Sequence, residues 1–310
     1  MERNREKKRA IFFMLASSLG FALMNLFVRL SGPLPTDQKS FFRNLIAFIF
    51  VAITYLFASK RQQAGAEHDR SFRELGRRDI VLLCLRSVFG LLGVLANFYA
   101  LDHMPVANAS VFNKTAPFFT LLFSFILLKE RVKLYQIFAM IMAFIGVLVI
   151  SNLGSAELFS VEFLPVLIAL AGGFFAGLAY TTVRKLGQLK IQGQVIILFF
   201  SGFSTLVLGV KMLFSFQAMS LSSFFFLVLA GLAAALGQFG VTFAYRYAPA
   251  REVSIYDYST IVFTALLSFV FLAEHPTLRA SVGAILIFLA ALYMFWRQSH
   301  EEAIAEVHSK

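Results

Sequence analysis

Long apolar runs follow one another along the whole chain and constrain its fold more than any other feature. A helix needs about 20 apolar residues to cross the hydrocarbon core of a bilayer. The sequence therefore predicts an all-α, polytopic membrane helix bundle with ten transmembrane helices; nine or eleven would require merging or splitting a run. The expected spans are residues 10–29, 40–58, 79–101, 105–128, 134–152, 162–184, 192–213, 220–245, 250–273 and 277–297.

The composition agrees with a membrane protein. The chain is 59% hydrophobic and 15% charged, whereas soluble domains carry roughly 25% charged residues. The first apolar run extends from Ala10 to about Val28, longer than the core of about 7–15 residues in a secretory signal. We therefore expect an uncleaved first helix. The single cysteine, Cys84, excludes a disulfide scaffold and multi-cysteine metal sites.

Positive charge is distributed unevenly between the two sides predicted for the membrane. The net charge is +11, but the basic residues collect in short segments between apolar runs and leave no basic face for a nucleic-acid partner. Segments on the N-terminal side hold 21 of the 28 Lys and Arg residues, and the opposite side holds five, namely Arg29, Lys39, Arg43, Lys211 and Arg279. This bias favours a multi-pass protein of a cell membrane with both termini cytoplasmic, and the short loops favour a bacterial inner membrane.

The two halves of the sequence resemble each other. A shift of 144 residues places Pro105 on Pro249 and Glu130 on Glu274, and a shift of 155 places Arg29 on Arg184. We expect a first five-helix repeat at residues 1–152 and a second at 153–310. Because five is odd, the second repeat would enter the membrane inverted, an arrangement typical of secondary transporters.

Several motifs resemble the EamA branch of the drug/metabolite transporter superfamily. They are Ala100-Leu-Asp-His-Met-Pro105, Val106-Ala-Asn-Ala-Ser110, Ala116-Pro117-Phe118 and Leu128-Lys-Glu130, with degenerate copies at Ala244-Tyr-Arg-Tyr-Ala-Pro249 and Leu272-Ala-Glu274. The resemblance implies ten helices in two inverted repeats around a central cavity. It also implies a small-molecule cargo, since members move amino acids, nucleotide-like metabolites, vitamins and drugs, and many bacterial members are exporters.

Two charged residues lie deep within predicted spans, Lys114 in the fourth and Asp257 in the ninth. A central Lys or Asp costs roughly 2.5–3.5 kcal/mol on the insertion scale, so such residues usually face a cavity or a partner. We hypothesise that Lys114 holds a carboxylate or phosphate of the substrate, and that Asp257 balances its charge or carries a coupled proton. The alternative is a charge pair that only locks the halves together. At 1.5 Å per residue, Lys114 would lie roughly 13 Å below the outer end of its helix and Asp257 roughly 10 Å above the inner end of its own. In a hydrocarbon core about 30 Å thick this leaves several ångströms between them, which predicts a pair bridged by substrate or water rather than a direct bond.

Other polar residues complete the predicted substrate site. Asn113 and Tyr258 adjoin the charged pair, Asn25 and Tyr180 occupy repeat-equivalent positions, and Asn97 and Gln238 lie on the third and eighth helices. Each is expected either to line the cavity or to bond a neighbouring backbone. Arg86 is expected to reach the headgroups with its long side chain rather than to face the cavity. Tyr245, Tyr247 and Trp296 are expected to be interfacial anchors.

Enzyme signatures are missing from the sequence. It contains no Gly-rich phosphate loop, no His-Glu-x-x-His motif and no nucleophile elbow, so no enzyme, metal or cofactor is expected. The leading interpretation is a secondary active transporter that exports a small organic metabolite, amino-acid-like or otherwise polar or anionic, with a candidate coupled proton. A non-transporting membrane sensor or scaffold is the alternative, followed by an intramembrane enzyme. The oligomeric state stays open.

Overall fold

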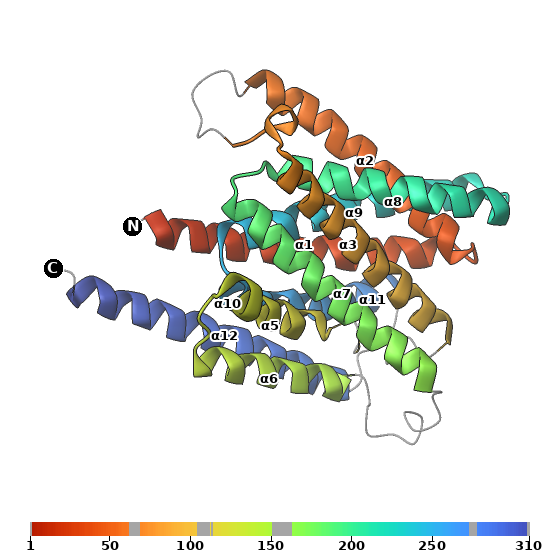
Figure 1. The fold of residues 1–310 in the computed structure, drawn as a ribbon. Helices are drawn as coiled ribbons and strands as arrows, with labels where there is room; N and C mark the ends of the chain where they lie inside the picture. The colour runs from red at the N-terminus through yellow and green to blue at the C-terminus, as the bar shows by residue number, and fades with distance from the viewer. Residues whose placement is uncertain are drawn as a thin grey trace.

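The structure, a computed structural model, describes residues 2–61, 69–103, 112, 114–150, 163–272 and 278–308. Within these ranges the chain is helical and forms no strand (Figure 1). The elements are α1 (Glu2–Leu30), α2 (Thr36–Arg61), η1 (Phe72–Glu74), α3 (Arg77–His103), α5 (Ala116–Leu128), α6 (Leu134–Ile150), α7 (Phe163–Gln188), α8 (Gly193–Ser215), α9 (Leu221–Tyr247), α10 (Ala250–Val253), η3 (Ser254–Tyr258), α11 (Ser259–Leu272) and α12 (Leu278–His308). Each predicted apolar run thus contains helix.

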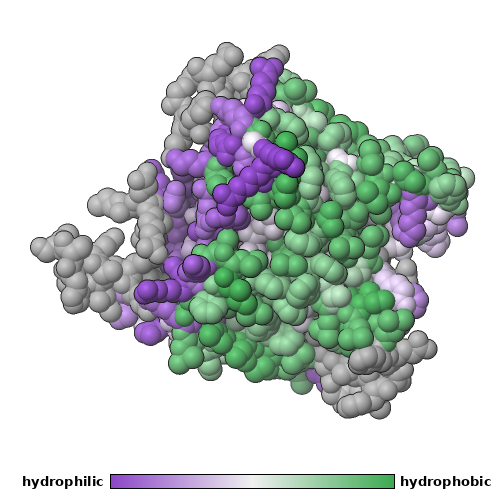
Figure 2. Space-filling model, in the orientation of Figure 1, coloured by the Kyte–Doolittle hydropathy of each residue, from purple (hydrophilic) through white to green (hydrophobic). Residues whose placement is uncertain are grey.

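The helices present an apolar belt of the kind that lipid would cover. Seven are long and apolar enough to cross a membrane, and three shorter apolar helices cover 116–128, 134–149 and 281–297 in the described residues. Large apolar side chains on the outer surface are strongly exposed, among them Phe57, Leu213 and Phe214. Figure 2 shows this apolar surface beside a polar end, which is the end where both chain termini lie in Figure 1. We call it the termini end. The all-helical membrane fold is confirmed, and the count of ten crossings stays a prediction.

The helices pair in a pattern that relates the two halves of the chain. The helix α1 packs against α9 and α11, and α7 packs in the same way against α3 and α5. The pairs α2–α8 and α6–α12 each join one helix from either half. Because α1 and α7 each pack against two helices of the other half, polar residues of both halves meet in the interior.

Glycines allow the closest helix contacts. A Cβ atom added at Gly20 would lie 2.6 Å from the backbone nitrogen of Gly237, and one at Gly240 would lie 2.5 Å from the Phe13 carbonyl oxygen. Along α7, Gly173 approaches Phe112 and Gly177 approaches Thr120, so the small-xxx-small pattern at 173–177 marks contact with the fourth span inside one chain. These positions fix the distance between α1 and α9 and between α7 and α5.

The fourth and ninth spans are both interrupted, although each was expected to be one continuous helix. In the fourth, Lys114 and Thr115 form a turn, and α5 begins at Ala116. Pro117 occupies the first turn of α5, where its missing N–H is tolerated, whereas a helix interior would lose a hydrogen bond there. In the ninth, the 3₁₀ helix η3 separates α10 from α11. Lys114 and Asp257 therefore both lie at breaks in helical geometry.

Candidate functional site

The centre of the site is an ion pair between the two halves of the chain. The Nζ atom of Lys114 lies 3.0 Å from Oδ2 of Asp257 and 3.2 Å from the main-chain oxygen of the same residue. The two side chains are 16% and 13% exposed. Largely withdrawn from solvent, the pair satisfies both charges where an isolated charge would be costly.

The prediction of a bridged pair is wrong, because the two residues bond directly. The depth argument assumed a rise of 1.5 Å per residue along straight helices. Asp257 instead lies in η3, and a 3₁₀ helix rises about 2.0 Å per residue, which carries it deeper into the bundle. Lys114, in a turn rather than a helix, adds the reach of its own long side chain.

Side chains from α1 and α11 hold the break around Asp257 in place. Its carbonyl oxygen accepts hydrogen bonds from Thr260 Oγ1 at 2.8 Å and from Ser18 Oγ at 3.5 Å. Ser18 also donates to the Tyr256 carbonyl at 3.2 Å. These donors replace the hydrogen bonds that an α-helix would make, as buried carbonyl groups require. A stretch of 3₁₀ helix within a longer helix often marks a functional hinge.

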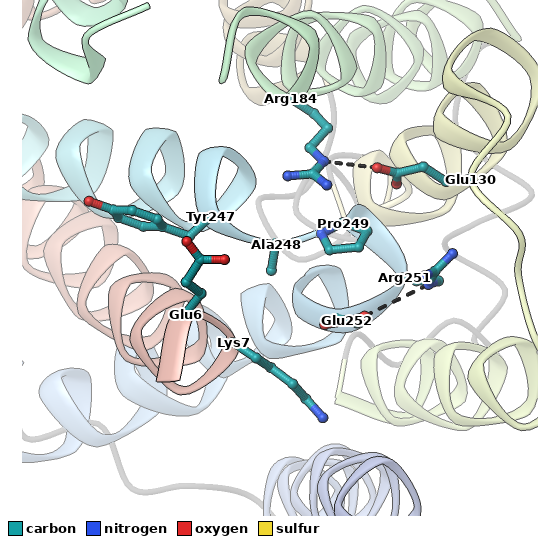
Figure 3. Close-up of a pocket in the computed structure, with 9 residues that line it drawn as sticks. All are labelled: Glu6, Lys7, Glu130, Arg184, Tyr247, Ala248, Pro249, Arg251 and Glu252. Carbon is teal, nitrogen blue, oxygen red and sulfur yellow. Dashed lines mark hydrogen bonds and ion pairs between the residues drawn. The ribbon is translucent and has the colours of Figure 1, made fainter. Parts of the chain in front are cut away.

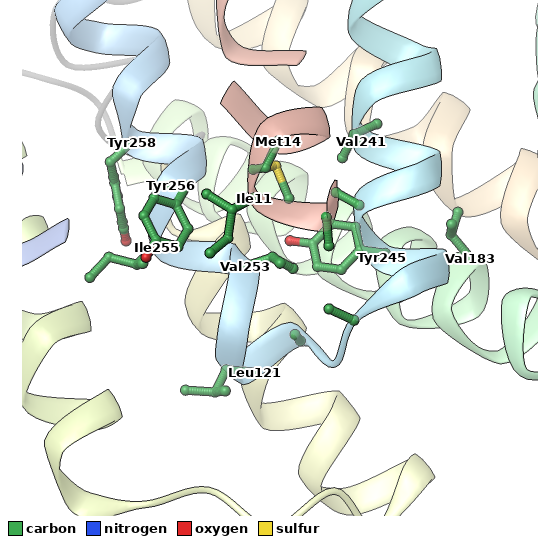
Figure 4. Close-up of a cluster of buried hydrophobic side chains, with 14 of the residues drawn as sticks. Ile11, Met14, Leu121, Val183, Val241, Tyr245, Val253, Ile255, Tyr256 and Tyr258 are labelled. Carbon is green, nitrogen blue, oxygen red and sulfur yellow. The ribbon is translucent and has the colours of Figure 1, made fainter. Parts of the chain in front are cut away.

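Tyr258 joins the ion pair to the other half through its hydroxyl, which donates to the Lys114 carbonyl at 3.2 Å. Tyr245 is also buried, and its hydroxyl lies 3.2 Å from Ser254 Oγ. The expectation that Tyr245 is an interfacial anchor is therefore wrong. Figure 4 shows Ile11 and Met14 of α1 between Tyr245 and Tyr256, in a buried hydrophobic cluster that also contains Tyr258, the sequence neighbour of Asp257.

Arg86 lies in the interior and does not extend to headgroups, so that prediction is also wrong. It is 2% exposed, and its Nη2 donates to Oε1 of Gln238 on α9 at 3.2 Å. Its guanidinium lies 4.2 Å from the ring centroid of Phe200, a cation–π geometry. Gly90, one turn further along α3, makes room, because a Cβ atom there would collide with Nη1 of Arg86. The predicted site residue Gln238 thus belongs to a buried polar contact.

Arg43 is a buried polar residue that the sequence analysis assigned to an outer segment. It is 8% exposed and lies seven residues into α2 from Thr36. Its Nη1 atom lies 3.5 Å from Sδ of Met24 on α1. The sequence placed it inside the 22-residue apolar span Thr36–Phe57, but seven residues from the helix end a long side chain can still reach the interface.

Tyr180 connects these groups. Its ring stacks on Tyr245 with centroids 5.2 Å apart, and its hydroxyl lies within electrostatic range of Asp257, Arg86 and Arg43. The structure therefore brings Lys114, Asp257, Tyr258, Tyr180 and Gln238 together from the predicted set, and adds two arginines.

The remaining predicted residues have separate positions. Asn25 is exposed on α1, two turns beyond Ser18 on the same helix face. Asn97 is half-buried on α3, where its backbone faces Gly172 of α7. Asn113 lies outside the described residues. A role in substrate binding stays a prediction for all three.

A polar pocket of about 380 Å³ opens at the termini end (Figure 3). Across it, Nε of Arg184 lies 2.8 Å from Oε1 of Glu130, and Nη1 of Arg184 donates to the Arg246 carbonyl at 3.1 Å. Lys129 adopts a left-handed conformation after α5 and directs the chain toward this contact. The remaining lining residues are Glu6, Lys7, Tyr247, Ala248, Pro249, Arg251 and Glu252. No group of His, Cys, Asp and Glu suited to a metal ion occurs in the part of the chain that the structure describes.

Comparison with known proteins identifies relatives along the full length of the fold. The chain is 29% identical over 287 residues to the pseudopaline exporter CntI of Pseudomonas aeruginosa, covering 92% of this chain and 95% of that protein. It is 24% identical to the riboflavin transporter of Rhizobium johnstonii, covering 96% and 95%. A crystal structure with 16% identity superposes with a TM-score of 0.74 over 92% of this chain and 98% of the other, which shows a shared fold.

The EamA-like transporter family matches the chain twice, over residues 8–152 and 163–296. Each match contains one member of the central ion pair, Lys114 in the first and Asp257 in the second. Together they span most of the sequence, and the relatives named above are transporters. The chain belongs to the EamA-like transporter family.

Proposed function

We propose that this protein moves a small organic molecule across a bacterial inner membrane by alternating access. The observation that carries the proposal is the Lys114–Asp257 ion pair, which joins the two family-matching segments within an apolar belt. Buried charges at helix breaks on the boundary between two halves are the arrangement that secondary transporters use to bind cargo.

The two matching segments are proposed to be inverted repeats of five helices each. The pairing of α1 with α9 and α11, and of α7 with α3 and α5, supports this symmetry. Both termini lie at the same end of the molecule (Figure 1), which supports an even number of crossings. With the basic residues at that end, both termini are cytoplasmic in this proposal.

The symmetry is broken in a way that fits one state of a transport cycle. The C-terminal ends of α7 and α9 pack through Tyr180, Tyr245 and the Arg184 contacts, all near the termini end. The equivalent helices α1 and α3 make at most marginal contact within the described ranges. In the proposed cycle this state is closed at the termini end. The opposite end closes when α1 and α3 come into contact and α7 and α9 separate.

The direction and coupling of transport are further parts of the proposal. Export is favoured because a relative across 92% of the chain is named an exporter. Asp257 is the carboxylate of the central pair and therefore the proposed carrier of a coupled proton. Protonation of Asp257 would release Lys114 and loosen the contact between the halves, so a proton and a conformational change would be linked.

Paired cysteines test alternating access directly. In a Cys84→Ser background, Tyr180→Cys with Tyr245→Cys reports closure at the termini end, where the rings lie 5.2 Å apart. Asn25→Cys with Leu101→Cys occupies the repeat-equivalent positions and reports closure at the opposite end. A short bis-methanethiosulfonate reagent joins the cysteines, because a ring separation does not fix the Cβ distance that a direct disulfide needs. The first pair is expected to be cross-linked in the resting protein, and the second only during turnover.

Reconstituted vesicles supply the functional arm of the test. Cross-linking of the second pair should stop counterflow of accumulated cargo, and reduction of the cross-link should restore it. Constant reactivity of both pairs in the presence of every cargo screened would contradict the proposal and favour a sensor or scaffold on the same fold.

A further inference from the structure

The described interior contains more positive charge than its own carboxylates balance. Lys114 is neutralised by Asp257. Arg43 and Arg86 have no carboxylate within 4.0 Å among the described residues, and both are more than nine-tenths buried. Buried charges in proteins are normally paired, because an isolated charge is costly in an apolar environment. Two guanidinium groups are therefore left with uncompensated charge.

Both guanidinium groups also retain unused hydrogen-bond donors. Within the described ranges, the Nε–H groups of Arg43 and Arg86 have no acceptor. The side-chain hydrogen bond of Arg43 there goes to a thioether sulfur, and that of Arg86 goes to the amide oxygen of Gln238. A guanidinium group carries five N–H donors in a planar fork that matches carboxylate and phosphate oxygens. The unused donors are thus of the type that binds oxyanions.

Neighbouring side chains extend the same chemistry. Because Gln238 accepts from Arg86 through its oxygen, its amide N–H₂ group is directed elsewhere and can donate. Tyr180 lies within electrostatic range of both arginines, and Phe200 supplies an aromatic face under Arg86. The groups come from α2, α3, α7 and α9, and these helices contact one another in the pairs α2–α9, α3–α7 and α7–α9.

We propose that Arg43 and Arg86 form an oxyanion subsite for the transported molecule, and that this molecule is an organic anion with two acidic groups. This inference rests on the proposed transport function and assigns its substrate class. A dianion compensates both guanidinium charges, whereas a neutral or cationic cargo leaves them unbalanced. The role first given to Lys114 passes to the arginines, because Lys114 already bonds Asp257.

Ligand-dependent thermal unfolding of the purified full-length protein tests the subsite. The probes are dicarboxylates and phosphate monoesters of several sizes, each with the corresponding monoacid, amide and diamine, at constant ionic strength so that bulk screening is equal. Inorganic phosphate and sulfate serve as non-organic dianions. Organic dianions are expected to raise the unfolding temperature most. A larger effect of neutral or cationic probes, an equal effect of the inorganic ions, or no effect of any dianion would overturn the inference.

Variants locate the effect. Arg43→Gln and Arg86→Gln should each weaken dianion binding at least tenfold, while Arg43→Lys and Arg86→Lys, which keep the charge, should retain part of it. Lys211→Gln is the matched control, because it removes one positive charge from an exposed side chain at the opposite end. Unchanged dianion affinity in the folded Gln variants would overturn the assignment. If a Gln variant does not fold, the corresponding Lys variant is used, and unchanged dianion affinity in it would likewise overturn the assignment.

The paired-cysteine assay separates the two proposals. Dianion binding without any change in which cysteine pair is cross-linked would support the subsite and contradict transport. A change in which pair is joined, driven by an uncharged cargo, would support transport and contradict the subsite.

Discussion

Lys114 donates to two atoms of one residue, the carboxylate and the main-chain oxygen of Asp257. The ion pair is therefore also a clamp on the backbone of η3, at the point where the ninth span changes from α10 to α11. A side chain that binds a backbone break can couple cargo or proton binding to the angle between two helices.

A double-mutant cycle distinguishes a lock from a binding site. Lys114→Met and Asp257→Asn should each destabilise the protein by about 2–3 kcal/mol, between the values for exposed and buried pairs, because both side chains are partly exposed. The double variant should lose less than the sum of the two. Unfolding in a denaturant series measures these values. Recovery of transport in the double variant would identify the pair as a lock, and folded protein without transport would identify a role in the cycle.

The contact between Arg86 and Gln238 gives a second prediction. Gln238→Leu removes the acceptor of a buried guanidinium and should cost about 1–3 kcal/mol. Adding Arg86→Met should recover part of that loss, because the double variant leaves no unpaired charge. If Arg86 instead extended to headgroups, Gln238→Leu would leave the unfolding temperature unchanged.

Gly90 offers a substitution that displaces Arg86 without changing its charge. Gly90→Ala places a methyl group against Nη1 of Arg86 and 2.7 Å from the Phe200 ring. We expect weaker dianion binding with a modest loss of stability, since overpacking costs about 1–3 kcal/mol. Gly76→Ala is the control, because its Cβ atom would lie 3.6 Å from the nearest side chain, that of Asp79. Equal dianion affinity in the two variants would contradict the placement of Arg86 in the subsite.

The sequence predicted the location of the apolar helices and the central charged pair, because both follow from the cost of polar groups in lipid. It did not predict the breaks at Lys114 and η3. The break at η3 is held by hydrogen bonds from Ser18, far away in the sequence, and from Thr260, nearby, and periodicity reveals neither. The direct ion pair and the burial of Tyr245 follow from those breaks.

The arginines show a second limit of prediction from the sequence. Arg43 and Arg86 lie seven and nine residues from the ends of their helices, close enough for a long side chain to reach an interface. The direction of each side chain is set by tertiary neighbours, Met24 for Arg43 and Gln238 and Phe200 for Arg86. Distance along a helix does not contain that information.

The contact between Arg184 and Glu130 gives a prediction about the termini end. Glu130→Gln removes the ion pair across the pocket while Arg184 keeps its bonds to carbonyl groups of α9. We expect the pocket to widen more often and expose Ala248, because the chain after α5 then loses its charged contact with α7. Maleimide labelling of Ala248→Cys, in a Cys84→Ser background, should become at least threefold faster. Asp37→Asn, which breaks an ion pair with Lys211 at the opposite end, should leave the labelling rate unchanged.

The closest approach of α1 and α9 gives the last prediction. A Cβ atom at Gly240 would lie 2.5 Å from the Phe13 carbonyl and 2.6 Å from the Ser17 nitrogen, and backbone atoms of a packed helix have little freedom to move away. Gly240→Leu should therefore separate α1 from α9 and break the bond from Ser17 Oγ to the Gly237 carbonyl, now 2.7 Å long. Because α1 also carries Ser18, the same shift would withdraw a donor from the Asp257 carbonyl. We expect poor folding, measured as loss of the monodisperse peak in detergent, and Gly240→Ala should show an intermediate loss of unfolding temperature together with loss of transport. Wild-type stability of Gly240→Leu would show that the α1–α9 spacing does not hold the central site in place.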